Sequence, residues 1–507
     1  MSQSEGSDSD PVAAAERWLL VGQPVVFAIG VILAWYVAVP TTVEALLRPS
    51  VVVVAFAVVA LGLATVVTRS WAVGALVSST FVLFSLRELT PALVMAAATA
   101  AWPLLIAVRR VMNRPRPPQR FPWTVARATG IFSAVYLLTM GAGAVAAAVG
   151  GRPEMHLPQY VAAGTGGPNI YFVLLDGYPR TDTLDETFGI DNQPFVRNLE
   201  ELGFSVADDA RTNYNKTWLT LASALNGAYI EDLLGDEATP ADAPGELRWL
   251  QALIREASVP RLLRDRGYAI RTVPPPYTSA ALTSADEVLD QGHLTEFEVK
   301  LISASPWTLI FRDQIAPLLY EAQGQRVIDD LATTVELAES PPSEPQFVLS
   351  HIHSPHPPFV LRPSAGSDSP SVPDCFPGCS LWEARIESLG MTFDDYRNEL
   401  SLQVAALNEM LLSSIRRITA ADPAAVVILM SDHGTRYSLE DLPEHYRSFF
   451  AARTPGVESV FPPDESPVNI FRRLMAAYFD VDIEPLPYRA WTLDWAYNLR
   501  LTERPAE

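Results

Sequence analysis

Acidic and histidine side chains follow two short apolar runs in this chain. Asp176 ends the run NIYFVLLDG, and Asp432 and His433 follow the run AAVVILMS. Runs of this length, rich in β-branched residues and ending at glycine, are typical of buried strands. Carboxylates and neutral imidazoles are ligands of divalent metal ions, and adjacent residues at a strand end can both reach one ion where the backbone turns. We therefore predict a metal site that contains Asp176, Asp432 and His433. Asp176 alone, before Gly177, would fit a simple turn equally well.

A third run, QFVLSHIHSPHPPF, leads into a loop that contains His351, His353 and His356. These three and His433 make up four of the seven histidines in the chain, which favours a functional role. We predict that this loop contributes to a functional site. The alternative is a surface loop stiffened by proline with one structural histidine.

The stretch NYNKTWLTLASALN offers a nucleophile. Its Lys216 is one of only two lysines in the chain, and it precedes Thr217 at the expected start of a helix. Thr217 is the preferred nucleophile over Thr220 and Ser223, since only Thr217 lies at the helix entrance, where backbone N–H groups and the helix dipole favour anions. The alternatives are a helix-capping threonine and a lysine that points to solvent.

The pattern from residue 168 to 495 predicts an α/β fold. Strand-like runs alternate with helical stretches such as Phe393 to Ile418, which favours a mostly parallel central sheet flanked by helices. Ligands of open α/β sheets bind beyond the carboxyl ends of the strands, so three strands that each deliver Asp or His there can share one site.

The first 150 residues predict a bundle of about five transmembrane helices, because a helix needs about 20 apolar residues to cross a bilayer. The third run is short and could be re-entrant, and the first could instead be a signal peptide. The apolar runs are roughly Trp18 to Val39, Val51 to Val67, Trp71 to Leu86, Pro91 to Val108 and Ala128 to Val149.

Charge sets the expected topology. The segment Arg109 to Arg127 holds six arginines and no acid, which places it in the cytoplasm. Counting helices from there gives a cytoplasmic N-terminus and an extracytoplasmic C-terminal domain in a multi-pass cell-membrane protein. The expected parts are a cytoplasmic acidic tail (1–16), a transmembrane domain (17–150), a linker (151–168), a catalytic domain (169–495) and a C-terminal tail (496–507).

Composition excludes nucleic acid as a partner. Residues 1–150 hold 10 arginines and 6 acids, so 27 of the 37 basic and 52 of the 58 acidic residues fall in the remainder, which nets −25. Phosphate backbones are bound by clustered lysine and arginine, which so acidic a region does not predict.

The two cysteines, Cys375 and Cys379, lie in PDCFPGCSLW, where proline and glycine turn the chain between them. In an oxidising compartment we expect a small-loop disulfide. A metal pair would need two further ligands at the usual spacings, which are not found nearby.

The order of these features resembles the alkaline phosphatase superfamily, in particular its membrane-anchored, sulfatase-like branch with lipoteichoic acid synthases and phosphoethanolamine transferases. The features are the strand that ends in Asp, the Thr at a helix start, the PHPPF loop and SDHG near the end, together with the segment SPVNIFRRLMAAYF and a membrane half before the catalytic domain. The resemblance covers about residues 169–490.

The resemblance implies roles for individual residues. Asp176, Thr217, Asp432 and His433 would bind one divalent ion, Mn, Mg or Zn, and a second ion stays open. Asp176 stands where lipoteichoic acid synthases have Glu. Thr217 would be the nucleophile, Lys216 would add positive charge, and His356 would hold the substrate phosphate or protonate a leaving group. His351 and His353 would assist in substrate binding.

We hypothesise from the sequence a membrane-bound, metal-dependent phosphotransferase or phosphodiesterase that acts on a phospholipid, a lipid-linked substrate or a cell-envelope polymer through a threonine nucleophile. Sulfate ester hydrolysis is the nearest rival, but NKTWLT lacks the Cys (or Ser)-x-Pro-x-Arg motif of formylglycine sulfatases. A non-catalytic envelope scaffold is the rival from another class. A transporter is disfavoured, since the apolar runs carry almost no intramembrane charge. The sequence leaves the substrate, the acceptor and the oligomeric state open.

Overall fold

The computed structural model describes residues 21–505 apart from 40, 88, 113–120, 150–153, 163, 236–245, 365–371, 378–384, 439, 441 and 495–499. The tail 1–16 and parts of the expected linker and C-terminal tail lie outside these residues. The chain divides into two compact units. The first consists of residues 1–150 and 300–312, and the second of residues 151–299 and 313–507.

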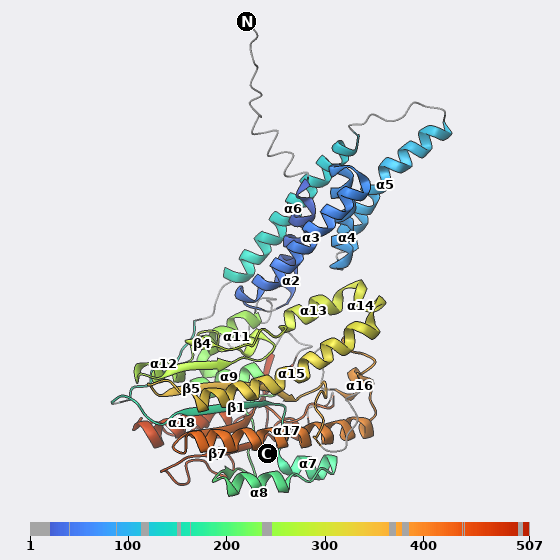
Figure 1. Cartoon of the computed structure of the whole chain (residues 1–507). Coiled ribbons are helices and arrows are strands. Elements are labelled where there is room, and N and C mark those ends of the chain that lie inside the picture. Colours follow the sequence, from blue (N-terminus) through green and yellow to red (C-terminus); the bar gives the residue numbers. More distant parts are fainter. Residues whose placement is uncertain are drawn as a thin grey trace. The chain divides into compact units, whose positions relative to one another are not determined.

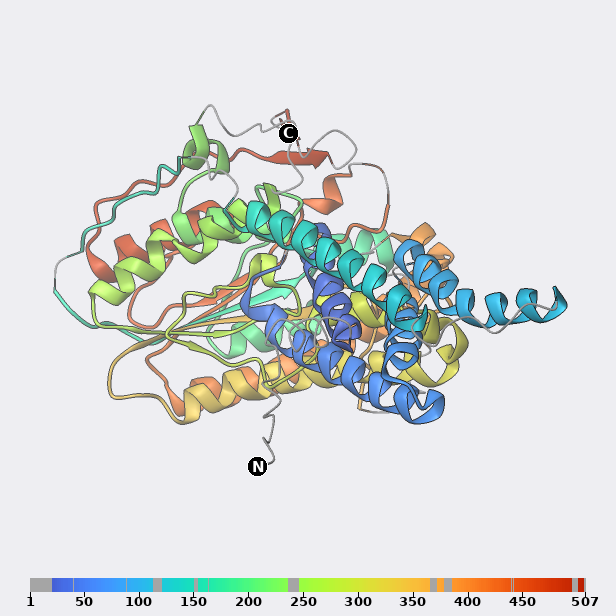
Figure 2. The same cartoon turned by 90° about the horizontal axis from the view of Figure 1, so that it is seen from above.

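The first unit is helical, and each of the five apolar runs overlaps one of its helices (Figures 1 and 2). Its helices are α2 (Gln23–Ala38), η1 (Glu44–Leu46), α3 (Leu47–Thr68), α4 (Trp71–Ser85), α5 (Leu89–Val111), α6 (Phe121–Val149) and α14 (Pro306–Ile310). Neighbouring helices pack around an apolar cluster that includes Phe27, Leu76 and Met95.

Among the described residues, two helical segments are long and apolar enough to cross a membrane, Glu44–Thr68 and Thr124–Ala148. In the most apolar 18-residue stretch of each segment, only 17% and 11% of the residues are buried, so most of this apolar surface faces outward. Helices α2 and α4 and the apolar part of α5 are shorter. The five-span bundle therefore stays a prediction.

Helix α14 comes from the middle of the chain but packs within the first unit. The Trp307 Nε1 atom donates a hydrogen bond of 2.8 Å to the Ser85 hydroxyl. The Trp307 ring lies 5.7 and 6.0 Å, centroid to centroid, from the rings of Phe81 and Phe84. The next apolar residues are exposed, with 81% of Leu309 and 60% of Ile310 accessible. Part of the predicted catalytic segment thus belongs to the helical unit.

The second unit contains a seven-stranded sheet with the order β2-β7-β6-β1-β5-β3-β4. The five neighbouring strands β6, β1, β5, β3 and β4 are parallel to one another. At the β6 end of the sheet, β7 pairs antiparallel with β6, and β2 pairs antiparallel with β7. This arrangement confirms the predicted largely parallel central sheet. A separate hairpin pairs β8 with β9. The strands are β1 (Ile170–Asp176), β2 (Ser205–Val206), β3 (Ala269–Val273), β4 (Glu287–Val288), β5 (Gln346–Pro355), β6 (Val426–Ser431), β7 (Phe450–Arg453), β8 (Trp491–Asp494) and β9 (Arg500–Glu503).

Helices cover both faces of this sheet (Figure 1). The helices from residue 151 onward, apart from α14, are α7 (Thr181–Phe188), α8 (Gln193–Glu201), α9 (Thr217–Asn226), α10 (Ile230–Leu234), α11 (Glu246–Arg255), α12 (Ser258–Asp265), η3 (Thr278–Ala280), α13 (Glu296–Ala304), α15 (Arg312–Glu339), α16 (Ile386–Leu389), α17 (Phe393–Ala421), η4 (Pro443–His445) and α18 (Pro467–Phe479), and α13 ends within residues 300–312 of the first unit. On one face, Phe172 of β1 and Phe347 of β5 pack against Phe471 of α18, in a core shared with α9, α11 and α12. On the other, Thr334 of α15 and Gln403 of α17 donate hydrogen bonds to Ser350 and Ser354 of β5.

The three central strands are the three apolar runs predicted from the sequence. Every residue of β1, β5 and β6 is buried, as expected of parallel strands that are covered on both faces. Helix α17 begins at the predicted Phe393, because Thr392 and Asp395 form a capping box. Cys375 is disulfide-bonded, but Cys379 lies outside the described residues, so the pairing stays a prediction.

A buried carboxyl group on α15 predicts a stability that depends on pH. Asp330 is fully buried, and neither carboxyl oxygen has a hydrogen-bond partner among the described residues. Burial raises its pKa to about 7, although Arg326 opposes the rise. The folded state thus binds a proton more tightly than the unfolded state, so the free energy of unfolding falls as the pH rises from about 4 to about 7.

We expect Asp330→Asn to raise the Tm by at least about 3 °C at pH 8, and by less at pH 5, since the amide removes the burial of charge. Thermal unfolding of the full chain in detergent at both pH values measures this. The exposed control Asp208→Asn should leave the pH dependence unchanged. A lower Tm for Asp330→Asn at pH 8 would contradict the prediction.

Candidate active site

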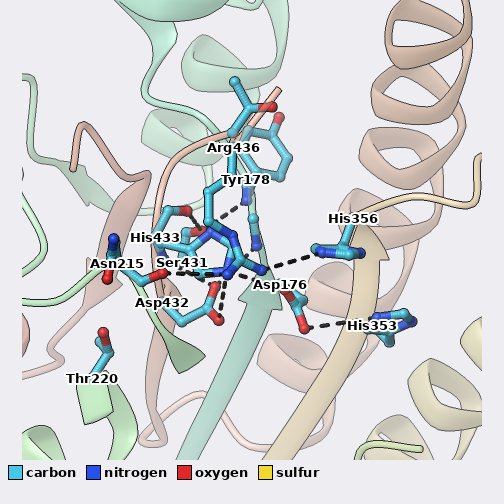
Figure 3. Close-up of polar contacts among 12 residues, drawn as sticks. Asp176, Tyr178, Asn215, Thr220, His353, His356, Ser431, Asp432, His433 and Arg436 are labelled. Carbon is cyan, nitrogen blue, oxygen red and sulfur yellow. Dashed lines mark hydrogen bonds and ion pairs between the residues drawn. The ribbon is translucent and has the colours of Figure 1, made fainter. Parts of the chain in front are cut away.

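Three neighbouring strands bring the predicted residues together at the carboxyl edge of the sheet. Asp176 ends β1, His351 and His353 lie near the end of β5, and Asp432 and His433 follow β6. Figure 3 shows Asp176 between His353 and His356 on one side and Asp432 and His433 on the other. Parallel strands place their carboxyl ends at one edge, which is why separated segments meet here.

The acidic residues and His433 form a cluster whose ligand atoms all lie within 4.8 Å of one another. The Nε2 atom of His433 lies 3.6 Å from Oδ1 of Asp176 and 3.4 Å from Oδ2 of Asp432. These three atoms are buried, and none has a hydrogen-bond partner among the described residues. Buried polar atoms are seldom left unpaired, since each costs free energy. Two carboxylates and one imidazole that converge in this way fit a divalent metal ion.

Hydrogen bonds to the remaining atoms hold these ligands in place. The other oxygen of Asp432, Oδ1, accepts from the backbone N–H groups of Gly177 and His433, both at 2.9 Å. The Nδ1 atom of His433 lies 2.7 Å from the Gly434 carbonyl, and since a carbonyl only accepts, Nδ1 carries the proton. The Nε2 lone pair therefore faces the cluster, in the tautomer that a metal ligand needs.

Two glycines make this packing possible. Gly177 has φ +71°, which L-residues rarely adopt, and a Cβ there would lie 3.3 Å from the His433 ring. A Cβ on Gly434 would lie 1.9 Å from the Glu444 carbonyl oxygen. The glycines that follow Asp176 and His433 thus let the backbone turn close to the site.

The electrostatics of the acids also suit a cation. Burial raises the pKa of Asp432 well above its ordinary value, and the nearby Asp176 carboxylate raises it further. Burial would also raise the pKa of Asp176, but His356, His351 and His353 hold it well below the ordinary range. Two carboxyl groups so close together and shielded from water repel each other unless a positive charge separates them.

Thr217 is the first residue of α9 and is buried beside the cluster. Its hydroxyl interacts with the carboxyl of Asp432 and with the hydroxyl of Tyr277. Lys216, rather than Thr217, occupies the N-cap position, and no side chain caps the helix. The capping role considered from the sequence is therefore wrong, because the helix begins at Thr217 itself, one residue earlier than a capping Thr217 would require.

The other two hydroxyls of this helix serve the backbone. Thr220 donates to the Tyr214 carbonyl at 3.2 Å, and Ser223 donates to the Ala228 carbonyl at 2.8 Å. Lys216 lies near the histidines, since its charge lowers the pKa of His356 and of His445. The Lys216 side chain is partly exposed, and its role beside Thr217 stays a prediction.

Of the three histidines that were predicted to lie in a loop, His351 and His353 lie on β5 instead, and His356 follows this strand. All three are buried, so the alternative of a surface loop is wrong. The Nε2 atoms of His351 and His353 lie 3.4 and 3.9 Å from Oδ2 of Asp176. Burial lowers the pKa of His353 to about 3, so this ring is neutral at physiological pH. The Nδ1 atom of His356 lies 2.6 Å from the Pro357 carbonyl, so its proton is on Nδ1 and its Nε2 is an acceptor.

Three residues near the site were missed from the sequence. The Tyr277 hydroxyl donates a short hydrogen bond to Oδ2 of Asp176 and lies 3.2 Å from Nε2 of His351. Arg436 donates to Nε2 of His356 and to the Asn215 carbonyl, both at 3.3 Å, and its buried Nε has no partner among the described residues. Burial lowers the pKa of the third residue, His445, to about 3, and the charges of Arg436 and Lys216 lower it further. The positions of two of these residues could have drawn attention to them. Tyr277 follows three prolines directly after β3, and Arg436 stands three residues after His433.

Comparison with known proteins identifies fold relatives among solved structures. A scan against protein-family models finds no match, and a search of curated proteins finds no relative. The C-terminal periplasmic domain of EptC from Escherichia coli, in complex with Zn, is 14% identical over 68% of this chain and 96% of that domain, with a TM-score of 0.40. A protein in the alkaline phosphatase superfamily from Vibrio parahaemolyticus is 11% identical over 66% and 75% of the two chains, with a TM-score of 0.38.

The lipoteichoic acid synthase LtaP from Listeria monocytogenes is 14% identical over 62% of this chain and 74% of that one, with a TM-score of 0.34. Proteins of the family that the sequence resembles are among the solved structures that this chain matches. Because identity at this level concerns the fold alone, the residues of the site must carry any conclusion about the reaction.

Proposed function

We propose that this protein is a metal-dependent phosphotransferase or phosphodiesterase in which Thr217 is the nucleophile. One observation carries the proposal. Buried ligand atoms of Asp176, Asp432 and His433 converge without hydrogen-bond partners beside the Thr217 hydroxyl. In a scaffold that never binds an ion, three such atoms would only destabilise the fold. This disfavours the non-catalytic alternative.

Asp176, Thr217, Asp432 and His433 would hold a single divalent ion, Mn, Mg or Zn. When bound there, such an ion lowers the pKa of a coordinated hydroxyl and offsets negative charge on a phosphoryl group. The Thr217 oxygen would attack phosphorus and give up its proton to water, while the bond from phosphorus to the leaving group breaks and that group takes up a proton from water. The phosphoryl group rests on Thr217 until water or an alcohol takes it. The backbone N–H groups at the start of α9 favour the negative charge that gathers beside them.

Arg436 and His356 fit the task of holding the phosphate oxygens. His356 already donates its only proton to the Pro357 carbonyl, so its Nε2 orients the guanidinium of Arg436 rather than protonating a leaving group. The unpartnered Nε–H of Arg436 is left to bind an oxyanion. This revises the role expected of His356, and it assigns to Arg436 the substrate contact that the sequence placed on the histidine.

We further propose that the substrate is a phospholipid, a lipid-linked molecule or an envelope polymer, and that the site works outside the cell membrane. Two apolar helical segments of spanning length and the basic segment after α5 support this placement. Sulfate ester hydrolysis through formylglycine is disfavoured, because a threonine occupies the nucleophile position and cannot be converted to formylglycine.

The test uses the purified full chain in detergent, with bis(4-nitrophenyl) phosphate and 4-nitrophenyl sulfate as substrates. We expect hydrolysis of the phosphodiester to exceed that of the sulfate by at least about 100-fold, to stop after EDTA treatment, and to return with Mn²⁺, Mg²⁺ or Zn²⁺. A higher rate on the sulfate, or phosphodiester hydrolysis that survives metal removal, would overturn the proposal.

A further inference from the structure

A pocket that is separate from the metal cluster is lined by five arginines. It has a volume of about 170 Å³. Its guanidinium groups belong to Arg180, Arg211, Arg447, Arg489 and Arg504. Such a gathering of positive charge is unexpected in residues 151–507, whose net charge is −25.

The backbone holds the arginine-bearing segments together. The N–H of Arg180 donates to the Arg447 carbonyl at 3.0 Å, and Arg211 and Arg447 form an isolated β-bridge. The N–H of Arg504, after β9, donates to the Ala490 carbonyl at 2.8 Å, just before β8. Main-chain pairing thus joins the segments of Arg180, Arg211 and Arg447 to one another, and it also joins the segments of Arg489 and Arg504. The cluster is therefore built into the fold rather than being a chance meeting of long side chains.

The two carboxylates that line the pocket are already engaged. Glu503 accepts two hydrogen bonds from Arg489, at 2.7 and 2.9 Å. Asp209 accepts one from NH1 of Arg180 at 2.8 Å, while Asp182 accepts two more from the same guanidinium. The lining itself holds five guanidinium groups and two carboxylates, and Asp182 and Glu186 add two acids next to Arg180 and Arg447, so arginines still outnumber the nearby acids.

Arg211 and Arg447 keep N–H groups to spare. Arg211 reaches Asp209 only at 3.5 Å, and its buried Nε has no hydrogen-bond partner among the described residues. The Cζ atom of Arg211 lies 4.6 Å from the centroid of the Tyr488 ring, and this stacking fixes the plane of the guanidinium group. The NH1 atom of Arg447 lies 3.8 and 4.0 Å from Asp182 and Glu186, too far for hydrogen bonds. Their side chains are 25% and 34% exposed, so a ligand can reach both.

We infer that this pocket is a second anion site, which binds the phosphate group of a small molecule or of a lipid headgroup. Guanidinium forks bind phosphate oxygens in pairs, and positive charges held together in a partly buried pocket are stabilised by such an anion. The Tyr488 and Tyr446 rings line the same pocket, where the guanidinium groups of Arg211 and Arg504 lie over them and are held in place. This site does not depend on the reaction proposed at Thr217.

One residue connects the pocket to the metal cluster. The N–H of Thr212, next to Arg211, donates to the Tyr446 carbonyl at 2.8 Å. The hydroxyl of Thr212 donates to the Asp432 carbonyl at 2.7 Å. The loop that carries Arg211 thus supports the residue that carries a metal ligand. A phosphate bound at Arg211 and Arg447 would hold this loop in place.

The test measures binding of inorganic pyrophosphate to the full chain in detergent by calorimetry, after metal removal, because pyrophosphate chelates metal ions. We expect Arg211→Gln and Arg447→Gln each to weaken binding at least about 10-fold, since each removes charge-assisted hydrogen bonds. Arg397→Gln is the matched control on the exposed face of α17 and should bind as the wild type does. Thr217→Ala should also bind normally, which separates this site from the proposed reaction.

Competition with dihexanoyl phosphatidylglycerol identifies the source of the phosphate. Displacement of pyrophosphate by this lipid indicates a lipid headgroup, whereas pyrophosphate binding without displacement indicates a soluble phosphate compound. Both results support an anion site at Arg211 and Arg447. Equal pyrophosphate affinity in the wild type and in a folded Arg211→Gln/Arg447→Gln variant, or no binding of either probe, would overturn the inference.

Discussion

Replacement of Thr217 by alanine is expected to lower phosphodiester hydrolysis by at least about 10³-fold, because the variant lacks the oxygen that attacks phosphorus. Thr217→Ser keeps that oxygen and should retain a measurable rate well above that of the alanine variant. Rates on bis(4-nitrophenyl) phosphate at saturating metal measure both variants.

Two controls separate this effect from misfolding. The Tm of Thr217→Ala should stay within a few degrees of the wild type, since a single methyl and hydroxyl group are removed at the first turn of α9. Neither Thr220 nor Ser223 should substitute as nucleophile, because both hydroxyls are committed to backbone carbonyls. Hydrolysis by Thr217→Ala at the wild-type rate would rule out a covalent step on this residue.

Asp432→Asn is expected to abolish the stabilisation of the protein by metal. In the metal-free protein, burial and the nearby Asp176 oppose ionisation of Asp432, so a neutral amide should raise the Tm of the EDTA-treated chain. Asparagine keeps an oxygen for the N–H groups of Gly177 and His433 but lacks the charge of the unpartnered Oδ2. The wild type should gain stability when metal is added, and the variant should gain almost none.

Thermal unfolding with EDTA and with added Mn²⁺ or Zn²⁺ measures both changes, and metal analysis of the purified chain gives the stoichiometry. Asp422→Asn is a suitable control at the far end of β6, where the side chain accepts hydrogen bonds from the Asn169 amide and the backbone N–H of Ala424. A metal-induced rise in Tm that is equal in the wild type and in Asp432→Asn would show that the cluster is not the metal site.

Much of the site could be predicted because strand periodicity is local. His351 and His353 are two residues apart on one strand, so both side chains fall on one face, and both reach the Asp176 carboxylate. Asp176 and Asp432 were found because each follows a run of apolar residues that only a buried strand explains. The parallel sheet then brings these ends together.

The missed residues come from segments without such a pattern. Tyr277 follows three prolines, and its hydroxyl meets Asp176 only because β3 lies next to β5 in the sheet. Arg436 and His445 lie in irregular chain after β6, where sequence gives no direction for a side chain. The tautomers of His356 and His433 depend on carbonyl contacts that no sequence pattern reveals.

The return of residues 300–312 to the helical unit has a practical consequence for work on this protein. A fragment that begins at residue 151 would still contain α14, but without Ser85 and the phenylalanines against which Trp307 packs. Such a fragment should bind detergent or aggregate unless this turn is also replaced by polar residues. A protease that cuts only the linker before β1 would likewise leave the two pieces joined by noncovalent contacts of Trp307, so they should copurify.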